Sequence, residues 1–300
     1  MTAEPPAGKP VDTAADDRAA GNDGGEPHAS AGGAPDPQAL TRNGLHRDMT
    51  VGDHLLHHRP EAEDAQPRAG EAPPSPAVAA AVFGSRLALA ERFAAILADS
   101  GVSHGLVGPR EVPRLWERHV LNCAVVHPGI PAGVEVIDVG SGAGLPGLAL
   151  AIARSDVRMH LVEPMLRRTT WLQGAVEELG LDNVEVHRGR AEQFWDQLSA
   201  PVVTARAVAR LGELARWSLP LLRPGGSMLA LKGTSAREEL EADRAALRRL
   251  GAVSDAVETY GADVLSPATT VVRVTLGAKP ARRERPAKGP ARRSARRRPR

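Results

Sequence analysis

The residues with the clearest chemical potential form a glycine-rich run, DVGSGAGLPG, at positions 138–147. The run follows the β-branched stretch 134–139 and precedes an apolar stretch with helical spacing. Glycines at such a turn let the backbone bend sharply and approach a ligand, and the start of a helix offers free N–H groups. The run therefore predicts a cofactor site, with Gly140, Gly142 and Gly144 in contact with the cofactor.

Two classes of cofactor fit this run. Counted from Gly142 it reads GxGxxG, which is typical of nicotinamide and flavin enzymes. Counted from Gly140, in register with the strand, it reads GxGxG. Asp138 places a carboxylate before the turn, where it would repel a pyrophosphate but attract a sulfonium and its α-amino group. Glu163, 23 residues after Gly140, can accept the ribose hydroxyls of an adenosine in either class. S-adenosylmethionine is the predicted cofactor, and an NAD-dependent oxidoreductase is the alternative.

Three further side chains are candidates for the chemical step. Arg206 lies at the end of a strand candidate, and its always-charged, five-donor group suits a phosphate, a base edge or a carboxylate. Lys232, at the end of the next strand candidate, is a similar candidate. His119 lies on a helix that leads into the first strand, where a packed structural histidine is the alternative.

The elements that must position these residues alternate between strand and helix. The strand candidates are 134–139, 157–163, 184–187, 202–208 and 227–233, and the helical stretches between them are 146–154, 166–179, 211–222 and 236–250. Two late strands, about 252–260 and 270–276, have no helix between them. This alternation predicts a mostly parallel α/β sheet covered by helices on both faces, with an antiparallel hairpin at one edge. Residues 134–278 are expected to form this cofactor-binding domain.

A small helical cap is expected before the domain, over residues 76–133. Apolar residues with helical spacing over 77–100 predict one helix, which Gly101 is placed to end. A second helix is expected from Pro113, a good first-turn residue, through the segment LWERHVLNCAVV.

The two ends of the chain differ in charge from the body. Residues 1–75 are rich in Ala, Gly, Pro and acids, with 6 cations and 13 acids, and are expected to stay disordered. Residues 278–300 carry 11 cations and 1 acid, and the segment 279–300 is expected to be a disordered Arg-rich tail that contacts nucleic acid. A solvated tail that only aids solubility is the alternative.

Composition excludes several other functions. Cys123 is the only cysteine, which rules out an internal disulfide and a Cys-rich zinc site. The cluster His54, His57 and His58 lies in the segment expected to be disordered and receives no role, so no metal is predicted. No apolar run approaches the ~20 residues of a membrane span, and the N-terminus lacks a signal-peptide layout, so a cytoplasmic protein is expected.

These residues together resemble the RsmG (GidB) family, the ribosomal RNA small subunit methyltransferases G, in its actinobacterial form. The matching pieces are ERHVLNC at 117–123, DVGSGAGLPG at 138–147, GRAEQF at 189–194, ARAVA at 205–209 and LALKG at 229–233. The resemblance implies a seven-stranded, Rossmann-like class I S-adenosylmethionine-dependent methyltransferase. It also implies cofactor contacts at Gly140, Leu145, Ala191, Glu192 and Arg206. One departure is Asn122-Cys123, where the family has Asp-Ser.

The resemblance further implies methylation of N7 of guanine 527, in standard numbering, of 16S rRNA or the small ribosomal subunit, by an enzyme expected to be a monomer. N7 is unprotonated at neutral pH and the donor is already a sulfonium, so the enzyme has to align the reactants and needs no general base. Alternatives are a small-molecule methyltransferase on the same fold and a non-catalytic RNA-binding module.

Overall fold

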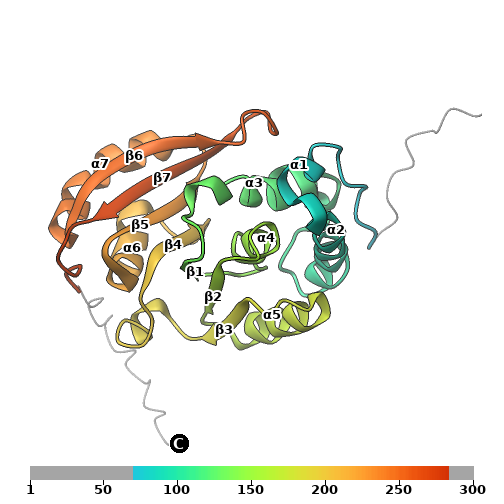
Figure 1. The fold of residues 1–300 in the computed structure, drawn as a ribbon, viewed down its shortest axis with the longest axis horizontal. Coiled ribbons are helices and arrows are strands. Elements are labelled where there is room, and N and C mark those ends of the chain that lie inside the picture. Colours follow the sequence, from blue (N-terminus) through green and yellow to red (C-terminus); the bar gives the residue numbers. More distant parts are fainter. Residues whose placement is uncertain (1–69, 284–300) are drawn as a thin grey trace, which may run out of the picture. The chain divides into compact units, whose positions relative to one another are not determined.

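The computed structural model describes residues 70–283, which are built around one seven-stranded sheet with the strand order β3-β2-β1-β4-β5-β7-β6 (Figure 1). The strands are β1 (Glu135–Val139), β2 (Arg158–Glu163), β3 (Val184–Arg188), β4 (Ala200–Arg206), β5 (Leu222–Lys232), β6 (Ala252–Tyr260) and β7 (Thr269–Leu276). The first five strands are parallel, and β7 runs antiparallel between β5 and β6. The predicted mostly parallel sheet with an antiparallel edge pair is confirmed.

Helices cover both faces of the sheet (Figure 1). They are α1 (Ala79–Phe83), α2 (Leu87–Ile96), α3 (Leu121–Ala124), α4 (Gly147–Ala153), α5 (Leu166–Leu179), α6 (Leu211–Ser218) and α7 (Ala236–Leu250). The buried side chains of α4 and α5 form one apolar core with the cap, and those of α6 and α7 form a second core on the opposite face. Central strands such as β1 are therefore buried on both faces, as parallel strands usually are.

The cap differs from the two regular helices that the sequence predicted. Gly101 does not end the first helix, because α2 continues into a π-helical turn, Leu97–Gly101, and the chain stays helical to residue 103. The second helix begins earlier than Pro113, as a 3₁₀ segment at Pro109–Arg114. It continues through a π-helical turn, Trp116–Val120, into α3. Such irregular turns break the regular helical spacing on which the prediction relied.

The bounds of three further elements differ from the prediction: α6 ends at Ser218 rather than at residue 222, and the strands β4 and β5 begin earlier. β4 begins at Ala200 and ends at Arg206, two residues on the N-terminal side of the predicted 202–208 at each end. β5 begins at Leu222, because Ala200 pairs with Leu222 across an irregular register. The sequence Arg-Pro-Gly-Gly that follows Leu222 is typical of a turn, which explains why the early part of β5 was not predicted as a strand.

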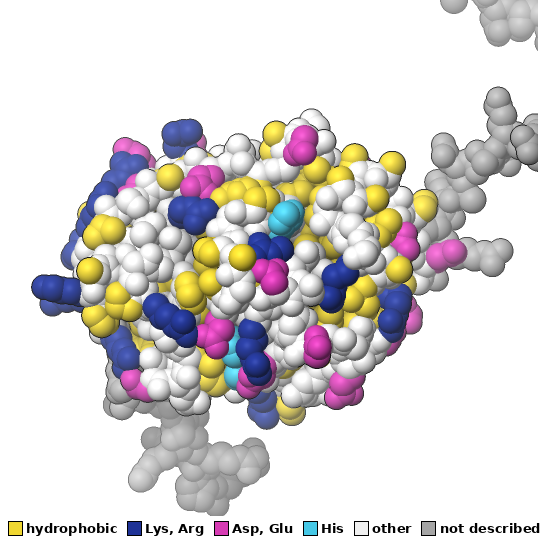
Figure 2. Space-filling model, in the orientation of Figure 1, with side chains coloured by type: hydrophobic (Ala, Val, Ile, Leu, Met, Phe, Trp, Pro, Cys, Tyr) yellow, Lys and Arg dark blue, Asp and Glu magenta, His cyan; other side chains and the backbone are white. Residues whose placement is uncertain are grey.

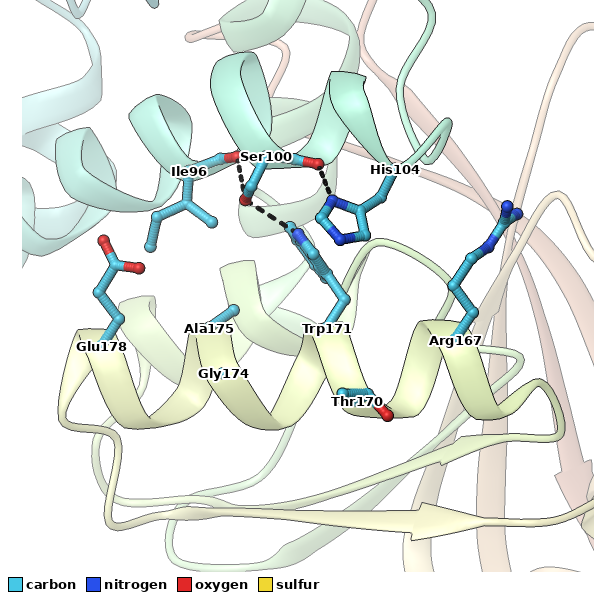
Figure 3. A pocket seen from close by; sticks show the side chains of 9 residues that line it. All are labelled: Ile96, Ser100, His104, Arg167, Thr170, Trp171, Gly174, Ala175 and Glu178. Carbon is cyan, nitrogen blue, oxygen red and sulfur yellow. Dashed lines mark hydrogen bonds between the residues drawn. The ribbon is translucent and has the colours of Figure 1, made fainter.

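The cap is joined to α5 through Ser100, whose surroundings Figure 3 shows. The indole nitrogen of Trp171 on α5 donates to Ser100 Oγ at 3.0 Å, and Ser100 Oγ donates to the carbonyl of Ile96 at 3.2 Å. His104 Nδ1 lies 2.8 Å from the Ser100 carbonyl. A cavity of about 420 Å³ between the two elements is lined by these groups. The bond from Trp171 joins the cap to the domain, and the other two hold Ser100 in place within the cap.

Both ends of the described part contact the body. Trp116 Nε1 donates to the carbonyl of Pro73 at 2.9 Å, and Arg283 pairs with Asp196 at 2.6 Å. Residues 70–75 and 279–283 are thus placed, although the sequence assigned them to disordered segments, because each supplies a partner to a side chain of the body. The predictions for residues 1–69, including the histidine cluster, and for 284–300 lie outside the described residues.

On the face of the protein that Figure 2 shows, the cationic side chains of the described residues do not form one patch. Figure 2 shows Lys and Arg side chains interspersed with Asp and Glu over this face. No helix among residues 70–283 is long and apolar enough to cross a membrane.

Candidate active site at the carboxyl ends of the strands

The glycine run forms a tight loop between β1 and α4. Gly140, Gly142 and Gly144 have φ values of 74°, 55° and 77°, a region that side chains rarely adopt. A Cβ atom on Gly140 would lie 2.8 Å from Val208 Cγ2, and one on Gly144 would lie 2.4 Å from Leu148 Cδ1. A Cβ atom on Gly142 would lie 3.8 Å from the nearest atom, the carbonyl oxygen of Gly140. Packing therefore requires glycine at 140 and 144, whereas position 142 is open.

Asp138 supports this loop from below. Its side chain is fully buried, Oδ1 accepts a hydrogen bond from Thr204 Oγ1 at 3.0 Å, and Oδ2 accepts one from the Gly147 N–H at 3.2 Å. Burial raises the pKa of this carboxyl to about 6. The carboxylate thus faces the start of α4. We find that Asp138 braces the loop rather than lining the cavity beside it, because its side chain lies on the face of β1 that α4 covers.

A cavity of about 370 Å³ opens beside the loop, at the carboxyl ends of β1, β2 and β4. This is where ligands bind in open α/β sheets. Of the predicted cofactor contacts, it is lined by Gly140, Gly142, Leu145, Glu163 and Arg206, and His119 lines it as well. Gly144, Ala191 and Glu192 are not among its lining residues. Ala191 is buried in the core on the α6 side, and Gly144 is turned against α4.

Glu163 lies in the wall of this cavity. Only 1% of the residue is exposed, and its carboxylate accepts hydrogen bonds from the N–H groups of Gly142 at 3.1 Å and Met165 at 3.0 Å. Arg168 lies 3.7 Å away. A carboxylate has about four lone-pair sites, so the two that remain are free to accept ribose hydroxyls. The position suits the predicted contact with the cofactor.

A second, larger cavity of about 1130 Å³ adjoins the first and shares Arg206, Ala207 and Val208 with it. Its cations outnumber its acids: Arg114, Arg118, Arg206, Arg210 and Lys232 against Glu117 and Glu239. Ala207 has a φ of 54°, the one positive value at a non-glycine residue in the described chain. Backbone strain of this kind persists where surrounding structure holds it and clusters at functional sites.

Lys232 lines the second cavity, but its ammonium group already has hydrogen-bond partners within the protein. Its Nζ donates to the carbonyl of Ala209 and to Glu239, both at 2.8 Å. The ammonium group therefore ties β5 to the segment after β4 and to α7. A direct role for Lys232 in the chemical step stays a prediction.

Arg206 and His119 meet at the junction of the two cavities. Arg206 donates to His119 Nδ1 at 3.1 Å and to the carbonyl of Arg118 at 3.1 Å, and His119 Nε2 lies 2.9 Å from Glu111. Burial, and then the neighbouring Arg206, lowers the pKa of His119. A guanidinium only donates, so Nδ1 must accept and the proton must reside on Nε2, directed at Glu111. The neutral imidazole thus holds Arg206 in place.

Two features of this region were not predicted. Glu111 had no signal in the sequence, because only the folded cap brings it to His119. Ser141, Ala143 and Met165 line the first cavity, and their position inside or just after recognised motifs could have indicated them.

The pair Asn122-Cys123 has a structural explanation. Asn122 Nδ2 donates to Thr269 Oγ1, and Thr269 Oγ1 donates to the carbonyl of Asn122, both at 2.9 Å, so α3 is joined to β7. Cys123 is fully buried, which raises the pKa of its thiol to about 11. At neutral pH the side chain is a thiol, so it is unsuited to act as a nucleophile.

The strand order, the glycine loop after β1 and the buried acid at the end of β2 define a Rossmann-like, class I S-adenosylmethionine-dependent methyltransferase. The chain belongs to the rRNA small subunit methyltransferase G family (GidB), whose model matches residues 86–265. The predicted family and cofactor are confirmed, the NAD alternative is wrong, and a small-molecule substrate is not favoured.

Two relatives in the same family agree with this assignment. The ribosomal RNA small subunit methyltransferase G of Streptomyces coelicolor is 58% identical over 213 residues, which cover 71% of this chain and 89% of that one. That of Mycolicibacterium gilvum is 51% identical over 72% of this chain and 96% of its own. Among solved structures, an O-methyltransferase family protein from Burkholderia thailandensis is 11% identical with a TM-score of 0.44, over 63% of this chain and 62% of that one.

Proposed function

We propose that this chain transfers the methyl group of S-adenosylmethionine to N7 of guanine 527, in standard numbering, of 16S rRNA in the small ribosomal subunit. The observation that supports this best is the wall of Arg206, Ala207 and Val208 shared by two cavities of different character. The smaller cavity lies against the glycine loop and suits the cofactor. The larger one carries an excess of cations, which suits the phosphates of an RNA strand.

The residues around the smaller cavity fit this cofactor. A positive φ at Gly140 and Gly142 lets the backbone approach the ligand, and Glu163 keeps lone pairs for a ribose. When bound, S-adenosylmethionine supplies a methyl group on a sulfonium; the carbon passes to the N7 lone pair, the C–S electron pair stays on sulfur, and the positive charge moves to the purine. No proton has to be removed, so no residue is needed as a general base.

Arg206 is the proposed catalytic residue. It stands at the shared wall, and its guanidinium can hold a phosphate or the guanine O6, which leaves N7 free. His119 is proposed to act through Arg206, because its imidazole accepts a hydrogen bond from the guanidinium. It is thus a positioning residue rather than a proton carrier.

The test is to map methylation on 16S rRNA from cells that lack the gene. The full chain should restore 7-methylguanine at this one position, and Gly142→Val should not, because its side chain would enter the cofactor space while meeting little of the protein. Restoration of a different base, or of none, would overturn the proposed substrate. We further propose that the enzyme acts in the cytoplasm, where the small ribosomal subunit is assembled, and that it acts as a monomer.

The Arg-rich segment beyond the described residues is proposed to strengthen binding to rRNA. Residues 284–300 carry eight cations and one acid, and cations that contact phosphates release counterions and make affinity depend on salt. Ending the chain at Arg283, which keeps the Asp196 contact, should weaken rRNA binding and flatten its salt dependence while the methylated position stays the same. An unchanged affinity and salt slope would leave the segment without this role.

A further inference from the structure

A cluster of two histidines and a glutamate lies at the β3 edge of the sheet, and none of the three lines the two cavities that meet at Arg206. His160 comes from β2, and Glu185 and His187 come from β3. Glu185 is the register partner of His160, and His187 is two residues further along the same strand, so the three side chains share one face. Figure 2 shows histidine beside acidic and basic side chains over these strands.

The distances between their polar atoms are those of a set of metal ligands. His160 Nδ1 lies 3.0 Å from His187 Nε2, and oxygen atoms of Glu185 lie 3.6 Å and 3.7 Å from these two nitrogens. Ligands at 2.0–2.1 Å from a tetrahedral zinc ion are about 3.4 Å apart. One ligand atom from each of the three side chains lies within 4.8 Å of the other two, so the side chains can converge on a single ion once the carboxylate and the rings turn toward it.

The surroundings also suit an ion. The two imidazoles are only 10% and 15% exposed, and imidazole nitrogen is a common zinc ligand. The Glu185 side chain is 51% exposed, so the side facing solvent is open to water. Behind the cluster, Glu135 on β1 lies 3.9 Å from His160 Nε2 and is itself paired with Arg223. A carboxylate behind a ligating histidine is a frequent feature of zinc sites.

We propose that His160, Glu185 and His187 bind one divalent transition-metal ion of the zinc type, with water in the fourth position. Two imidazole nitrogens and a carboxylate oxygen are a ligand set that zinc uses with an open position. The ion would link the edge strand β3 to β2. It would also brace the segment 189–194, because Phe194 packs edge-on against His187 at 5.6 Å between ring centroids.

The alternative is that the two imidazoles form only a hydrogen bond with each other and bind no metal. A titration with Zn²⁺ distinguishes this alternative from the proposed metal site. Untagged full-length protein, stripped of metal, is titrated with Zn²⁺ against a chromophoric chelator. One ion should bind per chain, and His187→Gln should weaken this binding by at least about 100-fold, as expected when one of three ligands is lost. Glu185→Gln is the second variant, because Glu185 is half exposed on an edge strand and its replacement leaves the core intact.

Two controls complete the test. His104→Gln removes a described histidine outside the cluster, and the triple variant H54Q/H57Q/H58Q removes the histidines near the N-terminus; both should keep the zinc site. Zn²⁺ should raise the melting temperature of the full chain but not that of Glu185→Gln. The proposal is overturned if both cluster variants bind Zn²⁺ as tightly as the full chain, or if only the triple variant loses binding.

Discussion

The glycine loop lines the smaller cavity and the Arg206 junction lies where the two cavities meet, and different parts of the chain hold the two in place. The loop, residues 138–147, is fixed by neighbours close in sequence, such as Leu148, and by the adjoining strands. The junction joins Glu111, His119 and Arg206, which the chain brings together from the cap and from β4. A ligand-binding loop is thus held by the sheet that carries it, whereas the group proposed to act on the substrate is also held by the cap, through His119 and the Arg118 carbonyl.

The largest effect should follow from changing the loop at Gly144. In Gly144→Ala the new methyl group would lie 2.4 Å from Leu148 Cδ1, which is fully buried, and φ would stay at 77°. Strain and overpacking together should cost roughly 2–4 kcal/mol of unfolding free energy and abolish cofactor binding. Urea unfolding and calorimetry with S-adenosylmethionine measure both effects.

Gly133→Ala is the matched control for Gly144→Ala. Its φ is 65° and no atom lies within 4 Å of the added Cβ, so only the backbone strain remains, about 1 kcal/mol. Equal losses in the two variants would show that the loop is not held by packing against Leu148.

The same contrast explains what the sequence could predict. The bounds of α5, α7 and β6 coincide with the predicted ones, because helical spacing and the left-handed glycines Gly180 and Gly251 are local signals. The turn at Gly140 was likewise predictable. The partner of His119 was not, because Glu111 reaches it only through a 3₁₀ segment. The direction of the Asp138 side chain depends on which face of the sheet α4 covers, which no local pattern states.

A second prediction concerns the junction. Arg206→Ala should lower methyl transfer by roughly 30- to 1000-fold, equivalent to about 2–4 kcal/mol, because a charge-assisted contact with the substrate is lost. Cofactor affinity should change far less. Arg210→Ala, in the same cleft but outside the shared wall, is the control and should keep most of the activity. Near-normal turnover of Arg206→Ala would make the junction a structural feature only.

The buried carboxylate under the loop leads to a prediction about pH. The pKa of Asp138 is about 6 in the folded protein and near 3.9 in the unfolded chain. Between pH ~3.9 and ~6, the carboxyl group is therefore protonated in the folded protein and ionised in the unfolded chain. The stability that this group contributes is thus greatest at low pH and is lost as pH rises toward 6, by at most about 1.4 kcal/mol per pH unit. Asp138→Asn does not titrate, so the parent should lose stability relative to it from pH 4 to 6.

Urea unfolding of parent and variant at pH 4.5, 5.5, 6.5 and 7.5 measures this difference. The asparagine can still accept from the Gly147 N–H and donate to the Thr204 hydroxyl, so the fold should survive. Asp156→Asn is the control. Pairing with Arg154 lowers the pKa of Asp156, so the difference in unfolding free energy between this variant and the parent should stay constant over this pH range. Parallel profiles for the parent and Asp138→Asn would contradict the prediction.

The smallest effect is expected from His119, which we propose acts through Arg206. His119→Asn places an acceptor near the position of Nδ1 and keeps the hydrogen bond from Arg206, whereas His119→Gln places its amide near Nε2 and keeps only the contact with Glu111. Arg206 also donates to the Arg118 carbonyl in both variants, so losing one bond should cost about 1 kcal/mol, or roughly fivefold in methyl transfer. The asparagine variant should therefore be the more active one.

The pH profile then separates positioning from packing. The lowered pKa keeps His119 neutral at pH 7, and protonation at lower pH turns Nδ1 into a donor that faces the Arg206 guanidinium. Transfer by the parent should therefore hold as pH drops through about 6.5, the usual histidine pKa, and fall only at the lower pH where the lowered pKa of His119 lies. Transfer by His119→Asn should not show this loss. The unfolded chain takes up this proton at a higher pH than the folded protein does, so the stability that His119 contributes falls as pH drops from about 6.5 toward the lowered pKa. If both variants are equally active and share the parent's pH profile, His119 only fills space, and the junction reduces to Arg206 and the cap backbone.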